Sequence, residues 1–228
     1  VANGNWTNEN NIKLEASATD SDTSEILTLY FEVVANNDNF SNSIFGACAS
    51  TTDWGDCNSK IWAVTSAAGD YSSTPFTGAV NPTILPTSTN GYKWQVKVCD
   101  DDGGCSNWTD PGADPNFNID HTAPTAPGNL NLVMARATSV KLSFGAPASE
   151  SNFAGYKIYY KQGTGAVSES DTLFGTTSDG NLNFIDYYNA ASTTIGNLTP
   201  GLPYVFNIFA YDLAGNKASG TIPLATTT

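Results

Sequence analysis

The segment Cys99-Asp-Asp-Asp-Gly-Gly-Cys105 places three carboxylates and two glycines between two cysteines, and a second pair, Cys48 and Cys57, encloses another loop. Cysteines so placed can bind zinc, exchange electrons or form structural disulfides. Zinc sites favour Cys pairs separated by about two to four residues, and redox pairs favour Cys-x-x-Cys. The pairs here enclose five and eight residues, so the spacing favours disulfides.

Cys99 ends an alternating apolar and polar run, and Cys105 begins the return after a glycine turn. Facing residues of antiparallel strands have Cα atoms about 4.5–5.5 Å apart, within the roughly 4.4–6.8 Å that a disulfide needs. Four cysteines allow three pairings. The local pairing, Cys48–Cys57 with Cys99–Cys105, needs the least rearrangement, and pairing across the two loops is the alternative.

The aspartates in and near these loops suit calcium, which takes about six to eight oxygen ligands. If one end of a sandwich gathers them, the candidate ligands are Asp20, Asp22, Asp100, Asp101 and Asp102. Aspartates also favour turns because they hydrogen-bond the local backbone, so solvated turns are the competing interpretation. We expect no required cofactor, and calcium is the ion that the pattern allows.

No catalytic residues are predicted. The sequence contains no nucleophile elbow, P-loop, dinucleotide fingerprint or HExxH motif, and its one histidine, His121, lies in a proline-containing segment. A pair of carboxylates can hydrolyse glycosides, but no pair is marked out among the 22 acidic residues. The chain is therefore predicted not to be an enzyme.

The net charge of −13 comes from nine basic and 22 acidic residues, and residues 1–121 hold 16 of the acids with four lysines. Such a surface repels phosphate backbones and anionic membranes. No apolar run approaches the roughly 20 residues that span a bilayer. We expect no nucleic-acid partner and no membrane insertion of this segment.

Most patterned segments alternate strictly. In residues 92–98 the apolar positions 92, 94, 96 and 98 alternate with polar ones, and similar runs occupy 26–34, 140–144, 156–160 and 204–210. A period of two, interrupted by Gly, Pro, Asn and Asp, predicts antiparallel strands rather than helices. Many short strands of this kind are typical of β-sandwiches.

The stretch Asp120-His-Thr-Ala-Pro-Thr-Ala-Pro-Gly128 is the clearest boundary, because its prolines favour a short, semi-rigid, extended spacer. All five tryptophans and all four cysteines precede it. We therefore expect two domains with separate cores, residues 1–121 and 122–228.

The segments Ala126-Pro-Gly-Asn-Leu130 and 197–216 resemble the opening and closing strands of a fibronectin type III domain, with matches at Leu198, Pro200, Gly201 and Tyr204. The resemblance implies a tyrosine corner, in which the Tyr204 hydroxyl bonds back to the chain. Phe144 stands where the family commonly has tryptophan, and it still fills a core position.

Immunoglobulin-like domains of prokaryotic surface proteins are resembled by the residues around Trp6 and by 14–22, 30–33, 92–100 and 117–120. The stretch 120–124 resembles the Asp-x-Thr-Ala-Pro phrase that joins such modules. Together the resemblances imply an all-β chain of two tandem immunoglobulin-like and fibronectin type III β-sandwiches, joined by a short Pro-containing linker.

Disulfides imply an oxidising compartment, so we expect an extracellular or cell-surface location. The favoured function is a non-enzymatic structural or adhesive module, a spacer or stalk, whose partners are other modules of the same or neighbouring chains. One alternative is a subunit of a self-assembling filament or layer that donates residues 11–17 to a sheet edge. Another is a carbohydrate-binding accessory domain in which Trp54 stacks on surface glycans, although Trp54 packing over a sheet edge is the competing interpretation.

Overall fold

The computed structural model describes residues 4–187 and 192–228. The chain divides into two compact units, Val1–His121 and Thr122–Thr228, and the division falls inside the proline-containing segment predicted as the boundary. Each unit has its own hydrophobic core. Across the described residues, no helix has both the length and the apolar character to cross a membrane.

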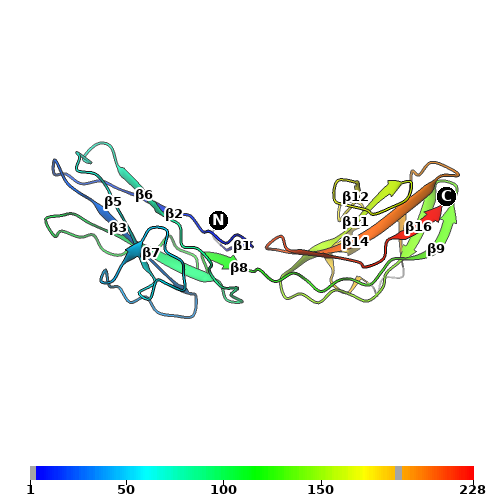
Figure 1. The fold of residues 1–228 in the computed structure, drawn as a ribbon, viewed down its shortest axis with the longest axis horizontal. Helices are drawn as coiled ribbons and strands as arrows, with labels where there is room; N and C mark the ends of the chain where they lie inside the picture. Colours follow the sequence, from blue (N-terminus) through cyan, green and yellow to red (C-terminus); the bar gives the residue numbers. More distant parts are fainter. Residues whose placement is uncertain (1–3, 188–191) are drawn as a thin grey trace. The chain divides into compact units, whose positions relative to one another are not determined.

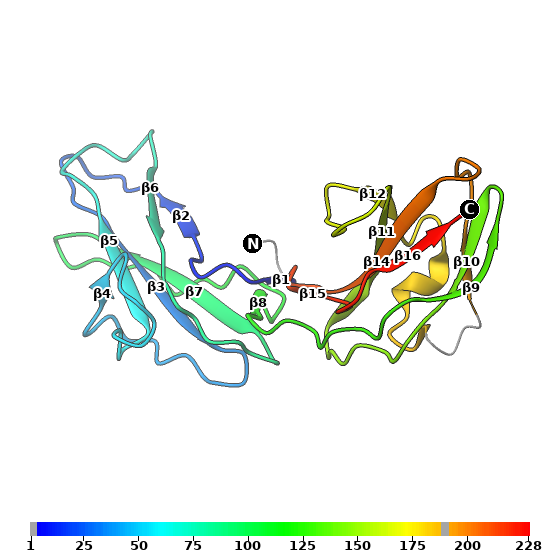
Figure 2. The same ribbon diagram turned by 45° about the vertical axis from the view of Figure 1, so that its right-hand side comes forward.

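The first unit is a sandwich of two β-sheets (Figures 1 and 2). Among its described residues, the larger sheet has the order β1-β8-β7-β3-β5-β4, and the smaller one pairs β2 with β6. The strands are β1 (Asn5–Thr7), β2 (Leu14–Ala18), β3 (Thr28–Ala35), β4 (Cys48–Ala49), β5 (Ile61–Thr65), β6 (Phe76–Val80), β7 (Tyr92–Cys99) and β8 (Phe117–Ile119).

The edges of the larger sheet differ from the antiparallel pairing that the sequence predicts. β1 pairs in parallel with β8, and β4 pairs in parallel with β5. The chain leaves β1 for the other sheet instead of turning back on itself, so β1 meets β8 running in the same direction. Parallel neighbours need such a crossover connection.

The core of the first unit follows the predicted alternation along β3. Leu29, Phe31 and Val33 are all buried, together with Leu27 just before the strand. The Phe31 ring stacks on the half-buried Trp94 of β7, with centroids 5.8 Å apart. Burying a side chain of this size stabilises the fold by roughly 1.5–3 kcal/mol, so this face holds the two sheets together.

The alternation predicts that the opposite face of β3 and β7 is exposed to solvent, but in the structure this face is buried. Glu32 and Gln95 stand opposite each other in register and are only 1% and 5% exposed. Gln95 Nε2 donates to Glu32 at 2.7 Å, and the backbone N–H groups of Ser41 and Asn42 donate to the same carboxylate at 2.5 and 3.2 Å. The loop after β3 covers this face because the carboxylate accepts its N–H groups. A buried charge is tolerable only when it is hydrogen-bonded in this way.

The second unit is also a sandwich, in which β9 and β10 form a layer separate from β11, β14 and β16 (Figure 2). Among its described residues the sheet orders are β13-β10-β9 and β12-β11-β14-β15, with β16 also paired to β14. The elements are β9 (Asn131–Arg136), β10 (Ser139–Ser143), β11 (Phe153–Gln162), β12 (Thr172–Phe174), the short 3₁₀ helix η1 (Gly180–Asn183), β13 (Thr193–Ile195), β14 (Pro203–Asp212), β15 (Lys217–Ser219) and β16 (Leu224–Thr227).

The second core is built around the antiparallel pair β11 and β14. Tyr156, Ile158, Phe206 and Ile208 of these strands are all buried. Phe144 is half-buried against this core, and its ring centroid lies 4.0 Å from that of Tyr187. The aromatic position predicted from the family resemblance therefore packs against the core.

We expect Glu32→Ala to lower the free energy of unfolding of the first unit by about 2–4 kcal/mol, because it leaves buried donors without an acceptor. Urea titration followed by tryptophan fluorescence measures this unit selectively, since all five tryptophans lie in residues 1–121. The control is Glu15→Ala, which removes an exposed carboxylate that pairs with Lys13. That variant should change stability by less than about 0.5 kcal/mol. Equal losses in the two variants would contradict the structural role of Glu32.

Candidate functional site

The turn after β7 is closed covalently. Cys99 and Cys105 form a disulfide with Cα atoms 4.1 Å apart, and the two residues also pair as an antiparallel bridge. Inside the turn, the Gly104 N–H donates to Asp100 Oδ1 at 2.6 Å, and Gly103 has a φ of +94°, which glycine adopts without a steric penalty. The turn is therefore fixed by a covalent bond and by its own aspartate.

The second disulfide joins Cys48 and Cys57, whose Cα atoms are 5.8 Å apart. The structure thus contains the local pairing rather than the cross-loop alternative. Both bridges close short loops of the first unit.

The stapled turn is tied to the segment that leads into β3. The Ile26 N–H donates to Asp101 Oδ1 at 2.9 Å. Beside it, Glu25 exchanges two backbone hydrogen bonds with Gly69, at 2.9 and 3.0 Å. The Glu25 carboxyl lies in hydrogen-bond contact with that of Asp101. We call Glu25, Asp100, Asp101 and Asp102 the acidic pole.

Contact between two carboxyl groups shifts their titration in opposite directions. The hydrogen bond with Asp101 is the largest cause that raises the pKa of Glu25 from 4.5 to about 7, and burial and the charges of Asp101, Asp102 and Asp100 add to it. The pKa of Asp101 is held below its ordinary value, first by the N–H of Ile26 and then by Glu25. Two carboxylates in contact do not readily ionise together, so Glu25 carries the proton of the pair.

The five aspartates predicted as calcium ligands do not all converge. Among the described residues, no three of these carboxylates have oxygens within 4.8 Å of one another. Asp20 and Asp22 form a turn of their own, in which the Asp22 N–H donates to Asp20 Oδ1 at 3.0 Å. Glu25 is the member of the pole that sequence reasoning missed, because its neighbours in space follow it by about 75 residues along the chain.

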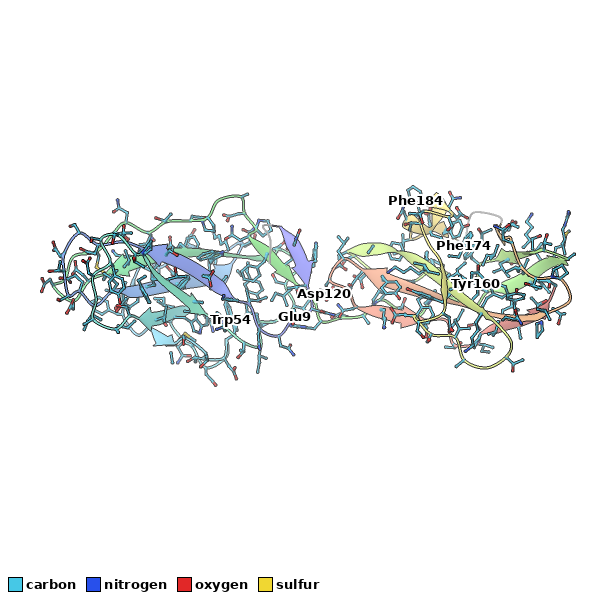
Figure 3. The ribbon with its side chains drawn as sticks, turned by 90° about the horizontal axis from the view of Figure 1, so that it is seen from above. Glu9, Trp54, Asp120, Tyr160, Phe174 and Phe184 are labelled. Atoms are coloured by element: carbon cyan, nitrogen blue, oxygen red, sulfur yellow. A yellow bond between two sulfur atoms is a disulfide. The ribbon has the colours of Figure 1, made fainter. Side chains whose placement is uncertain are left out.

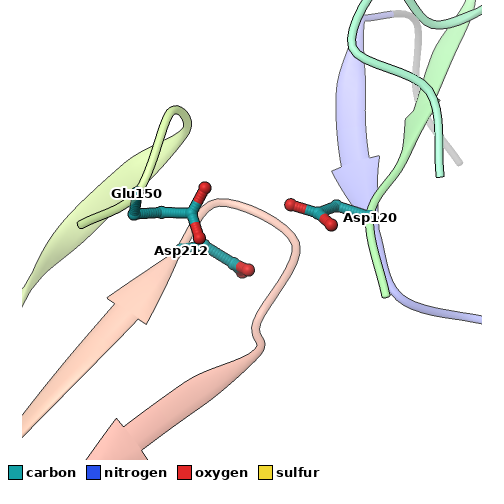
Figure 4. Close-up of side chains that lie close together, drawn as sticks. All are labelled: Asp120, Glu150 and Asp212. Atoms are coloured by element: carbon teal, nitrogen blue, oxygen red, sulfur yellow. The ribbon is translucent and has the colours of Figure 1, made fainter. Parts of the chain in front are cut away.

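Two carboxylates of the second unit also lie together, those of Glu150 and Asp212, with oxygens within 4.8 Å (Figure 4). The oxygens of Asp212 accept the backbone and side-chain N–H groups of Asn216, both at 2.8 Å. Glu150 accepts the Ser151 N–H at 2.6 Å. These carboxylates hold turns. Asp120, also drawn in Figure 4, belongs to the first unit.

Trp54, labelled in Figure 3, is half-buried in the loop that Cys48 and Cys57 close. Its ring stacks on Trp62 at 5.9 Å and meets Tyr92 edge-on at 5.3 Å. The Lys60 ammonium lies 4.5 Å from the ring centroid, and burial lowers the pKa of that lysine. The contacts match the packing interpretation, and they disfavour Trp54 as an open platform for sugars.

Tyr204 opens β14 with its hydroxyl turned back to the preceding loop. It is 6% exposed, and its oxygen accepts the Thr199 N–H at 2.9 Å. This is the corner that the family resemblance implies for Tyr204.

The family comparison agrees with this geometry. Residues 125–226 match the family model described as the fibronectin type III domain. The second unit is a fibronectin type III domain. The resemblance read from the Pro-Gly turn and Tyr204 is thereby confirmed, and the fibronectin type III unit extends over nearly all of residues 122–228.

Two further proteins are similar to this chain. Chitinase A1 of Niallia circulans is 32% identical over 111 residues, which is 48% of this chain and 13% of that protein. A crystal structure of titin domains covers 100% of this chain and 61% of its own, at 14% identity and a TM-score of 0.51. The chain thus spans a small part of the curated relative, and the titin likeness bears on the fold alone. The predicted all-β, tandem-sandwich architecture is confirmed.

We expect Tyr204→Phe to destabilise the fibronectin type III domain by about 1–3 kcal/mol, because the Thr199 N–H loses its acceptor. Tyrosine fluorescence or calorimetry of the full chain resolves this transition. The matched control is Tyr160→Phe, since the neighbouring Tyr160 ring packs on Phe206 at 5.5 Å and no hydrogen bond of its hydroxyl is found in the described part of the chain. A loss no larger than that of the control would contradict the corner.

We expect Glu25→Gln to stabilise the first unit relative to the natural chain near pH 8 and to match it near pH 4. The pKa of Glu25 is raised on folding. Its contribution to the stability of the folded first unit is therefore full below pH 4.5 and is lost as the pH rises toward about 7. Asp101, whose pKa is lowered, titrates below that window. Thermal melts followed by tryptophan fluorescence from pH 4 to 8 measure the gap. If the difference in Tm between Glu25→Gln and the natural chain does not grow as the pH rises, the Glu25–Asp101 contact is excluded.

Proposed function

We propose that this chain is a non-enzymatic structural or adhesive module of an extracellular or cell-surface protein, acting as a spacer or stalk. The fibronectin type III match over residues 125–226 carries the proposal, because this domain type commonly serves as a non-catalytic building block. The fold alone does not fix a role, so the remaining support comes from what the polar side chains do.

The polar side chains with the strongest contacts tie loops to strands. Glu32 and Asp101 accept backbone N–H groups in the first unit. In the second, the Tyr156 hydroxyl accepts the Ala148 N–H at 2.9 Å and donates to the Ile185 carbonyl at 2.8 Å. Asp179 accepts from Thr193 at 2.7 Å and from Tyr187. These carboxylates and hydroxyls stabilise loops by hydrogen bonds, which suits a module with a structural function.

The two disulfides support the proposed extracellular or cell-surface location. Two bridges in one small domain are typical of oxidising, extracellular environments. The partners proposed are other modules of the same or neighbouring chains. The net charge of −13 disfavours nucleic acid as a partner.

A second candidate function is a carbohydrate-binding accessory domain, favoured by the similarity to a protein named chitinase A1. Trp54 is packed on both Trp62 and Lys60, so a sugar would need other rings. The most exposed phenylalanines are Phe45 and Phe184, at 85% and 60%, the second of which is labelled in Figure 3.

The filament alternative has less support. Residues 11–17, proposed as a donor strand, largely form β2, which already pairs with β6 from Leu14↔Val80 to Ala18↔Phe76. Donation would require this pairing to break.

The purified chain is expected to stay as discrete particles in negative-stain microscopy and to release no product from chitooligosaccharides. It should also leave chitin unbound, and Trp54→Ala should give the same glycan-array signal as the natural chain. Fibrous assemblies would favour the filament. Product release would overturn the non-enzymatic assignment, and chitin binding that is lost in Phe45→Ala or Phe184→Ala would favour the accessory domain.

A further inference from the structure

The acidic pole is held rigidly from several sides. The Cys99–Cys105 bridge and the Asp100–Gly104 hydrogen bond fix the turn, while the Ile26 N–H anchors Asp101. Glu25 is fixed separately, by its paired backbone bonds to Gly69. The carboxylates are therefore held close together by the disulfide and by backbone hydrogen bonds, in spite of their mutual repulsion. A rigid arrangement of ligands lowers the entropic cost of binding.

The side chain of Glu25 is an independent observation that points to a ligand. Its side chain is 92% buried, since the residue is only 8% exposed, and Oε2 has no hydrogen-bond partner among the described residues. The charges that act on it are those of Asp101, Asp102 and Asp100. Gly69, across from it, contributes backbone alone. A buried carboxylate oxygen without a donor costs free energy, and carboxylate neighbours cannot offset that cost.

We propose that Glu25 and Asp101 together bind one divalent cation at the base of the stapled turn, with Asp100 and Asp102 adding negative charge around it. Calcium fits best, because the pole offers only hard oxygen ligands and calcium accepts irregular shells completed by water. Asp101 is anchored by the Ile26 N–H on Oδ1 while its carboxyl contacts that of Glu25. Glu25 Oε2, which has no hydrogen-bond partner among the described residues, is available to the ion, since the backbone of Glu25 makes the bonds to Gly69.

With two protein carboxylates and water completing the shell, the affinity falls in the range of extracellular modules, with Kd about 10⁻⁴–10⁻³ M.

Thermal melting of the full chain, followed by tryptophan fluorescence, tests the site. Millimolar calcium chloride should raise the Tm of the first unit near pH 8 by about 3–5 °C over chelator. Sodium chloride of equal ionic strength is the control for screening. Calorimetric titration at pH 8 should give one calcium per chain.

Three variants locate the ion. Glu25→Gln, which keeps the side-chain shape, should lose the calcium shift while folding normally. Asp101→Asn should also lose it, and Asp22→Asn, outside the pole, should keep it. No shift in the natural chain at pH 8, a shift that sodium chloride reproduces, or one that survives Glu25→Gln would overturn the proposal. Loss of the calcium-dependent rise in Tm in Asp22→Asn would also overturn the proposal. None of these outcomes bears on the module function proposed above.

Discussion

The register of β3 against β7 is the constraint on which the first unit depends. Eight consecutive pairs run from Thr28↔Cys99 to Ala35↔Tyr92. This register puts Phe31 into the core, sets Glu32 opposite Gln95 on the other face, and brings the residues before Thr28 beside those after Cys99. A slip of one residue would exchange the two faces of the strand, and it would separate Glu25 from Asp101. The Cys99–Cys105 disulfide closes the turn at the end of the same ladder.

Much of the fold can be predicted from the sequence because burial on one face leaves a period-two pattern. Residues 92–98 fall within β7 and residues 204–210 fall within β14, although β14 is buried on both faces and not on one alone. Tyr204 carries a recognisable local motif. The acidic pole cannot be predicted in this way, since it depends on which loops meet. The loop over Glu32 is a similar case. Its one signal in the sequence is a lone carboxylate inside the otherwise apolar run Tyr30-Phe-Glu-Val-Val34. An exposed face would not require apolar residues on both sides of that carboxylate.

The two units solve the same problem with different groups. Loops that cover a sandwich must satisfy their backbone N–H and carbonyl groups. Both units use carboxylates for this purpose. The first unit adds two disulfides, and the fibronectin type III domain adds tyrosine hydroxyls, from Tyr156 at 2.9 Å to Ala148 N and from Tyr204 at 2.9 Å to Thr199 N. The acidic residues are correspondingly concentrated before residue 122.

The bond between Ile26 and Asp101 joins positions 75 residues apart. Closing a loop of that length costs chain entropy before any contact repays it, so pairings of this kind form late in folding. Interactions made after the transition state slow unfolding and leave the folding rate almost unchanged. We therefore expect the contacts around Glu25 and Asp101 to slow the unfolding of the first unit more than they affect its rate of folding.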